Sequence, residues 1–116
     1  GQVLALRVYV ARLLAADPAA RVVVLGDMNT FEFTDDLAAI LPGDPPVLRP
    51  LADLVPAAER YSYNFEGNSQ ALDHAFVTES LLPAAELEYL HLNADFPAVP
   101  GSTASDHDPL VLRLRW

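Results

Sequence analysis

The stretch Val22-Val23-Val24-Leu25-Gly26-Asp27-Met28-Asn29 decides the fold. Its aliphatic run predicts a strand over residues 22–25 that is buried on both faces. The run ends in polar residues, and open α/β sheets bind ligands at the carboxyl ends of such strands. Asp27 and Asn29 are two residues apart, so in an extended chain they point the same way and would hold a metal-bound water or a phosphate oxygen. A Gly-Asp-x-Asn turn that only closes the strand explains the same residues.

The composition is that of an acidic globular domain. The 116 residues suit one domain over 1–116, and 52% of them are apolar. No apolar run approaches the ~20 residues that a membrane-spanning helix needs. The absence of cysteine excludes disulfides, thiolate metal sites and a cysteine nucleophile. A net charge of −9 disfavours a passive nucleic-acid-binding domain. It is compatible with carboxylates that hold a divalent cation, because the metal then supplies the positive charge that a phosphate needs.

Helical spacing of apolar residues predicts a helix over residues 3–16, before the central strand. After the strand, Thr34 would cap a short helix over 35–41. Residues 42–50 hold four prolines and a glycine, which predicts a turn-rich surface loop. Residues 51–60 fit either a short helical turn or a strand stub.

The second half of the chain alternates polar and apolar residues, which is typical of strands. Residues 61–65 and 71–77 predict an antiparallel hairpin whose loop is slightly longer than the tightest type. Residues 86–92 predict another strand, and residues 110–116 a last strand with one apolar face. The predicted fold class is α/β, with one mostly antiparallel or mixed sheet layered with one or two helices.

Three polar clusters lie at strand boundaries or on strand faces: Asp27/Asn29, Asp73/His74 and Asp106/His107/Asp108. Asp73 shares a strand face with small and apolar residues, where an unpaired carboxylate is costly, so we expect it to be paired, and His107 is a candidate partner. His74 lies on the opposite, apolar face and is expected to be a core histidine with a satisfied hydrogen bond. His91 has no acidic neighbour in the sequence and receives no role.

These residue types together suit hydrolysis of a phosphodiester. Such a reaction needs a divalent metal held by carboxylates, an oriented water and a donor for charge that develops on the phosphate. Asp and Asn oxygens are the ligands that Mg²⁺ and Mn²⁺ prefer. A histidine oriented by a buried carboxylate can shuttle protons or donate to the phosphate. Zinc fits less well, because it prefers several histidines and the three present are widely spread.

The motifs Gly26-Asp27-Met28-Asn29, Leu72-Asp73-His74 and Ser105-Asp106-His107-Asp108-Pro109 resemble the three C-terminal motifs of the endonuclease/exonuclease/phosphatase superfamily. This is the family of DNase I and the abasic-site endonucleases. The order and approximate spacing also fit, from about residue 10 to about residue 112. Tyr61-Ser62-Tyr63 and His91-Leu92-Asn93-Ala94-Asp95 are similar to the extracellular bacterial nuclease branch, which implies an extracellular or cell-envelope location. Met28 departs conservatively from the Phe or Leu that is frequent there.

The resemblance implies a role for each matching residue. Asp27 would orient or activate the attacking water, or protonate the leaving group, and Asn29 would help to hold the water or the phosphate. Asp73 would hydrogen-bond His107 and fix its orientation. His107 would contact the scissile phosphate, and Asp106 would help to bind Mg²⁺ or Mn²⁺.

The family fold is a larger, four-layer αββα sandwich whose N-terminal half supplies an Asn, a metal-binding Glu and a catalytic His or Tyr. Residues 1–25 contain no Glu, His or Asn, and the chain opens at Gly1 without an initiator Met. We therefore expect the C-terminal half of such an enzyme, with one sheet of the sandwich and little or no activity on its own. The missing N-terminal half would be its partner, and the sheet face meant for that half would allow self-association.

The expected function is part of a divalent-metal-dependent phosphodiesterase, a nuclease that acts on DNA or RNA. Two alternatives remain open. One is a lipid or sugar phosphodiesterase or phosphatase of the same superfamily. The other is a non-catalytic binding domain that keeps the fold.

Overall fold

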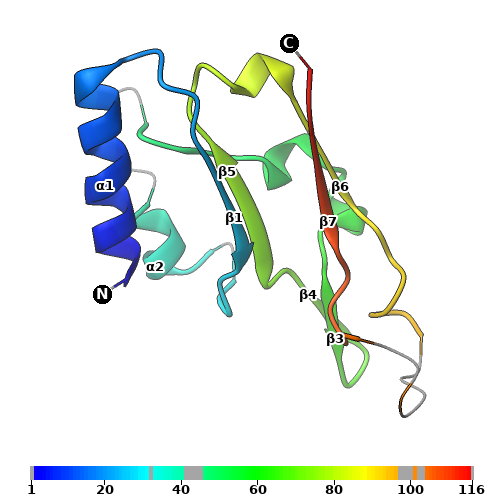
Figure 1. Ribbon diagram of the computed structural model, residues 1–116. Coiled ribbons are helices and arrows are strands. Elements are labelled where there is room, and N and C mark those ends of the chain that lie inside the picture. The colour runs from blue at the N-terminus through cyan, green and yellow to red at the C-terminus, as the bar shows by residue number, and fades with distance from the viewer. Residues whose placement is uncertain (1, 32, 41–45, 97–100, 102–103, 116) are drawn as a thin grey trace.

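A computed structural model describes residues 2–31, 33–40, 46–96, 101 and 104–115. Figure 1 shows three layers, in which α1 (Gln2–Ala16) stands beside β1 (Val23–Asp27) and β5 (Asp73–Val77), with a β-hairpin on the far side. That hairpin is made of β6 (Ala85–Tyr89) and β7 (Leu110–Leu114). The shorter elements are α2 (Asp35–Ala38), β2 (Arg49–Pro50), β3 (Tyr63–Phe65), β4 (Asn68–Gln70) and three 3₁₀ turns (Ala52–Leu54, Ala57–Glu59 and Leu82–Ala84). The α/β class is confirmed.

The described strands form three small antiparallel sheets, so the prediction of a single sheet was wrong. The largest has the order β1-β5-β2, and β3-β4 and β6-β7 are separate pairs. The predicted hairpin was also wrong in its pairing. Glu66 and Gly67 both take positive φ, at 52° and 80°, and close the tightest two-residue turn. The returning strand is therefore β4, and the next segment, β5, is left to pair with β1 and β2.

The pairing of β1 with β5 divides the side chains between two faces. Val24 lies opposite Phe76 and packs on the α1 side, where Val10 is fully buried. On the other face Val23 packs toward the β6–β7 hairpin. Leu25 shares that second face but is 56% exposed. The prediction that residues 22–25 are buried on both faces was therefore wrong, because the hairpin packs over the Val23 end only.

Two apolar clusters hold the layers together. The first lies between α1 and the sheet and contains Val10, Leu37, Ile40, Leu48 and Phe76. The second lies between the sheet and the β6–β7 hairpin and contains Leu51, Ala75, Val77, Leu81 and Ala85, with Leu110, Leu112 and Leu114 packed against it. The apolar face predicted for the last strand is thus confirmed, although β7 ends at Leu114 and Trp116 lies outside the described residues.

The segment after β1 differs from its prediction in two places. Thr34 stands at the N-cap of α2, but its hydroxyl donates to the carbonyl of Phe31 and makes no cap bond. The helix ends at Ala38, short of the predicted 35–41, and residue 41 lies outside the described residues. Of the predicted surface loop over 42–50, residues 42–45 are likewise outside. Its last residues are not a surface loop, because Leu48 is fully buried and β2 pairs with the edge of β5.

The remaining sequence expectations are met with shifted ends. Residues 51–60 form two 3₁₀ turns, so the helical alternative holds. The strand expected over 86–92 spans Ala85–Tyr89. Among the described residues no helix combines the length and the apolar character needed to cross a bilayer.

Candidate active site

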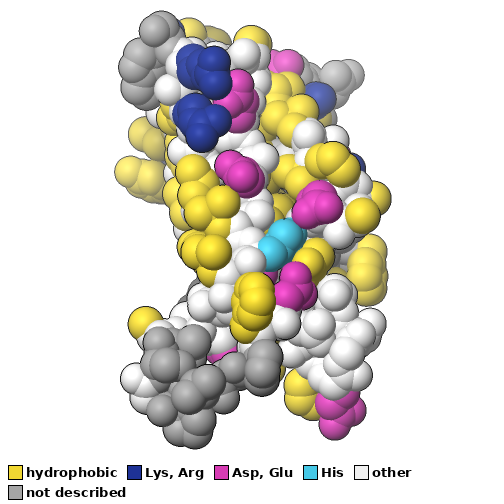
Figure 2. Space-filling model, turned by 90° about the vertical axis from the view of Figure 1, so that its right-hand side faces the viewer, with side chains coloured by type: hydrophobic (Ala, Val, Ile, Leu, Met, Phe, Trp, Pro, Cys, Tyr) yellow, Lys and Arg dark blue, Asp and Glu magenta, His cyan; other side chains and the backbone are white. Residues whose placement is uncertain are grey.

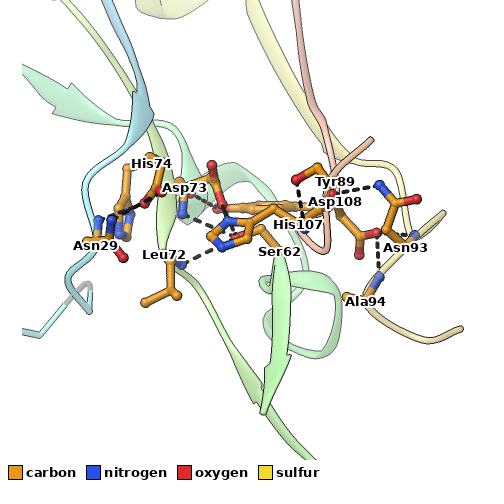
Figure 3. A network of polar contacts seen from close by, with 12 residues as sticks. Asn29, Ser62, Leu72, Asp73, His74, Tyr89, Asn93, Ala94, His107 and Asp108 are labelled. Carbon is orange, nitrogen blue, oxygen red and sulfur yellow. Dashed lines mark hydrogen bonds and ion pairs between the residues drawn. The ribbon is translucent and has the colours of Figure 1, made fainter. Parts of the chain in front are cut away.

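The Asp73 carboxylate lies at the start of β5 and joins two other segments. His107 Nδ1 is 2.6 Å from Asp73 Oδ2, across 34 residues of sequence, and the buried Ser62 hydroxyl donates to the same oxygen at 2.6 Å. The carboxylate only accepts, so Nδ1 carries the proton and the tautomer of a neutral His107 is fixed. The pairing of Asp73 with His107 that the sequence predicted is confirmed as a contact (Figure 3).

Asp27 and Asn29 form a local turn at the carboxyl end of β1. The Asp27 carboxylate accepts from the Asn29 backbone N–H at 2.8 Å and from its side-chain amide at 3.2 Å. Asn29 has a φ of 48°, so the chain is not extended there and the parallel side chains expected from an extended strand do not form. The turn that the sequence left as the alternative is present, and it still brings the acid and the amide into contact.

The sheet places Asp27 beside the Asp73–His107 pair. Asp27 lies directly opposite Asp73 in the antiparallel register. One ligand atom each of Asp27, Asp73 and His107 lies within 4.8 Å of the other two. Asp106 is exposed and is not a member of this three-residue cluster, although its charge acts on His107. The structure thus gathers two carboxylates and an imidazole at one end of the central strands.

The charges around His107 favour its protonated form. Partial burial alone would lower its pKa, but the hydrogen bond to Asp73 and the charges of Asp73, Asp27 and Asp106 outweigh burial and raise the pKa above its ordinary value. Tyr63 packs against the imidazole, with ring centroids 4.9 Å apart. The His107 ring is therefore fixed in position and its protonated form is favoured. Nδ1 bonds to Asp73, which leaves Nε2 as the second ring nitrogen.

His74 points away from this cluster. Its side chain is buried, and its Nε2 lies 2.7 Å from the Thr30 carbonyl oxygen. The ring lies near Phe76 on the α1 side of β5, with a centroid distance of 6.2 Å. The expectation of a core histidine with a satisfied hydrogen bond is confirmed.

A second polar network surrounds Asp108, whose side chain is fully buried. Its Oδ1 accepts from the backbone N–H groups of Leu92, Asn93 and Ala94 at 2.7–2.9 Å. Its Oδ2 lies 3.0 Å from His91 Nδ1. Burial by itself raises the pKa of Asp108, but these donors outweigh burial and lower the pKa below its ordinary value.

His91 also contacts groups other than Asp108. It stacks on Tyr61 with ring centroids 4.0 Å apart, and the Tyr61 hydroxyl donates to Asp95 at 2.8 Å. The Nε2 atom of His91 is buried and lies 3.2 Å from the Glu59 carboxylate, at an angle that makes no hydrogen bond. His91, which the sequence left without a role, is thus part of a packed polar network.

The strand register explains why the sequence did not reveal this network. Tyr89 pairs with Leu110, so His91 and Asp108 each lie two residues beyond that pair and come to opposite positions. The loop between them is rich in Pro, Gly, Ser and Thr and carries no periodicity. A predicted register for β6 and β7 would have placed the two residues together.

Comparisons with models of known protein families, with curated proteins and with solved structures gave no match for this chain.

Proposed function

We propose that this chain carries the histidine-and-aspartate part of the active centre of a divalent-metal-dependent phosphodiesterase, a nuclease that hydrolyses DNA or RNA. The observation that supports this best is the 2.6 Å hydrogen bond from His107 to Asp73, with the Asp27 carboxylate beside it. The motif resemblance supports the same assignment. We also propose that the chain forms one half of an αββα sandwich, with which its layered fold is compatible. An extracellular or cell-envelope location is a further part of the proposal.

His107 would serve as the donor to the scissile phosphate. Asp73 holds Nδ1, so a proton reaches a substrate only through Nε2. A raised pKa favours the imidazolium, and a cationic donor stabilises negative charge on phosphate oxygens in the transition state. A neutral histidine in the same place would act instead as a proton acceptor.

Asp27 and Asn29 would handle the water. The Asp27 carboxylate is exposed at the end of β1 and is oriented by two hydrogen bonds from Asn29. Such a fixed carboxylate can accept a proton from an attacking water, and the Asn29 carboxamide can orient that water or a phosphate oxygen. The mechanism thus divides between Asp27 on the water and His107 on the phosphate.

The donor set fits Mg²⁺ or Mn²⁺. Magnesium commonly keeps several waters and binds through one or two carboxylates together with substrate phosphates. Asp73 Oδ2 already accepts two hydrogen bonds and Asp27 is assigned to the water, so the exposed carboxylate of Asp106 would help to hold the ion, as the motif resemblance implies. A bound ion would polarise the phosphate and offset its charge. Further ligands would come from outside these 116 residues, so we expect little or no activity from the chain alone.

The surface charge is consistent with dependence on a metal. On the face shown in Figure 2, acidic side chains are spread along the molecule, and basic ones lie only in the upper part of the view. Arg113 and Arg115 each lie 3.1 Å from Glu86, which neutralises part of their charge. A polyanionic substrate would therefore be attracted by bound cations more than by this face.

The proposal is tested by nicking of supercoiled plasmid with Mg²⁺ or Mn²⁺, with RNA and bis(p-nitrophenyl) phosphate as further substrates. The reaction is run with the chain alone and with a longer natural protein that contains it. We expect strong nicking by the longer protein, which EDTA and His107→Ala abolish and the exposed-site control Glu88→Gln preserves. Nicking that survives His107→Ala would overturn the proposal. Turnover of the small diester without nucleic acid cleavage would favour a lipid or sugar phosphodiesterase.

A further inference from the structure

The segment that carries His107 lies outside any strand. Within residues 104–109, all of which the structure describes, Asp108 is the one buried residue, and His107 itself is half-buried. The backbone N–H of His107 donates to the Ser105 hydroxyl at 3.0 Å, which is a local contact. The segment is thus attached to the rest of the fold through the buried Asp108, through the His107 side chain, and through the Pro109 carbonyl oxygen, which accepts from the Leu90 N–H at 3.0 Å.

Two sets of hydrogen bonds that involve Asp108 fix the position of the His107 backbone (Figure 3). The carboxylate fixes residues 92–94, and from there the Asn93 side-chain amide donates to the His107 carbonyl oxygen at 2.7 Å. The backbone N–H of Asp108 donates to the Ser62 carbonyl oxygen at 2.7 Å. The hydroxyl of the same Ser62 donates to Asp73, the partner of His107. The same hydrogen-bond network, through Asp108 and Ser62, therefore contacts both His107 and Asp73.

We propose that Asp108 is a positioning residue that, through Asn93 and Ser62, holds the His107 imidazole against Asp73. The catalytic importance of this placement of His107 rests on the proposed function. The placement itself can be measured in this chain without any activity. A 2.6 Å hydrogen bond leaves little tolerance for movement of the backbone that carries it. A buried carboxylate with several charge-assisted donors is a suitably stiff anchor.

Three substitutions separate positioning from general stability. Asp108→Asn keeps the size of the side chain but replaces one acceptor oxygen with a donor facing His91. Asn93→Ala removes only the side-chain bond to the His107 carbonyl and leaves the Asn93 backbone N–H for Asp108. Asp95→Asn is the matched control, because it removes one charge from the same loop while its remaining oxygen still accepts from Tyr61. Circular dichroism and thermal melting check that each variant folds.

The readout is the imidazole Nδ1–H proton in NMR spectra of the chain with ¹⁵N-labelled histidine, at one fixed pH. A short bond to a carboxylate moves this proton far downfield, and its absence in His107→Gln and persistence in His91→Gln assign it. We expect the His107 signal in the wild type and in Asp95→Asn, and its loss or upfield movement in Asp108→Asn and Asn93→Ala. An unchanged signal in the folded variants, or no signal in the wild type, would overturn the proposal.

The design keeps the two proposals apart. If Asp108→Asn fails to fold, Asn93→Ala decides, because it deletes one hydrogen bond at a half-buried position. Loss of the signal in the folded variants supports positioning even when the longer protein nicks no plasmid. That combination would reject the proposed function alone.

Discussion

Asp27 and Asp73 stand directly opposite each other on two antiparallel strands, with their carboxylates on the same face of the sheet. Like charges in this cross-strand relationship destabilise a sheet by roughly 0.2–1 kcal/mol. Protonated His107 offsets part of that repulsion, because one of its ring nitrogens belongs to the same cluster. A divalent cation bound there would offset more.

Asp27→Asn should therefore stabilise the chain when no metal is present. We expect a melting temperature higher by about 2 °C in EDTA, for a gain of roughly 0.5 kcal/mol. Addition of millimolar Mg²⁺ should raise the melting temperature of the wild type and should raise that of Asp27→Asn much less. Differential scanning calorimetry in the two buffers measures both effects. Equal responses of the two proteins to Mg²⁺ would place any bound ion elsewhere.

Asp73→Asn should lower the pKa of His107 toward its ordinary value. The carboxylate supplies both the hydrogen bond and the largest charge that raise this pKa, while burial opposes them. A raised folded-state pKa contributes stability that is fully present below the ordinary pKa and is lost as the pH rises through the folded value. The wild type should thus exceed Asp73→Asn in stability by more at pH 5 than at pH 9. NMR titration of the imidazole C–H protons and urea melts at the two pH values check this.

Asp108 should make the chain sensitive to acid. Although burial disfavours its charge, the donors around it hold its pKa below the ordinary value. The stability that it contributes is present above the ordinary pKa and is lost as the pH falls through the folded value. The free energy of unfolding of the wild type should therefore fall more steeply below about pH 4 than that of Asp108→Asn. The exposed-site variant Asp53→Asn should follow the wild-type curve.

Tyr61 should ionise at a higher pH than an ordinary tyrosine. Its hydrogen bond to Asp95, with burial and the charges of Asp95, Glu59 and Asp108, raises its pKa to about 12. The associated stability is present below the ordinary value of 10.0 and is lost as the pH rises from there toward about 12. Absorbance at the phenolate band should show a delayed transition in the wild type that Tyr61→Phe removes. Asp95→Ala should bring the delayed transition to lower pH.

Leu48→Ala should be strongly destabilising. The side chain is fully buried beside Val10 and Phe76, and large-to-small substitutions at such sites lower stability by roughly 2–5 kcal/mol. Leu54→Ala makes the matched control, because Leu54 is 52% exposed and its truncation should change stability by about 0.5 kcal/mol or less. Chemical denaturation of both variants gives the comparison. Similar losses would mean that residues 46–48 do not belong to the core.

Local chemistry determined the pieces of this fold. Apolar spacing was enough to predict the first helix, the central strand and the apolar face of the last strand, since each depends on a pattern within one segment. The need of the half-buried Asp73 for a partner was also foreseeable, because an unpaired carboxylate on an apolar strand face is costly. The buried, hydrogen-bonded state of His74 was foreseeable in the same way, because this polar side chain lies on the opposite, apolar face of the strand.

Strand partnership was decided only by the tertiary structure. The two-residue turn at Glu66 and Gly67 makes β3 pair with β4 and not with β5. The burial of Leu48 places the proline-rich segment beside the edge of the sheet, where β2 pairs with β5. Register then brought Asp27 opposite Asp73 and His91 opposite Asp108, neither of which any local pattern encodes. The sequence by itself thus determined which residues needed a buried partner, because desolvation is a property of each side chain and its strand. Which partner each obtained depended on the pairing of distant strands, because contact between remote segments is set by the packing of the whole chain.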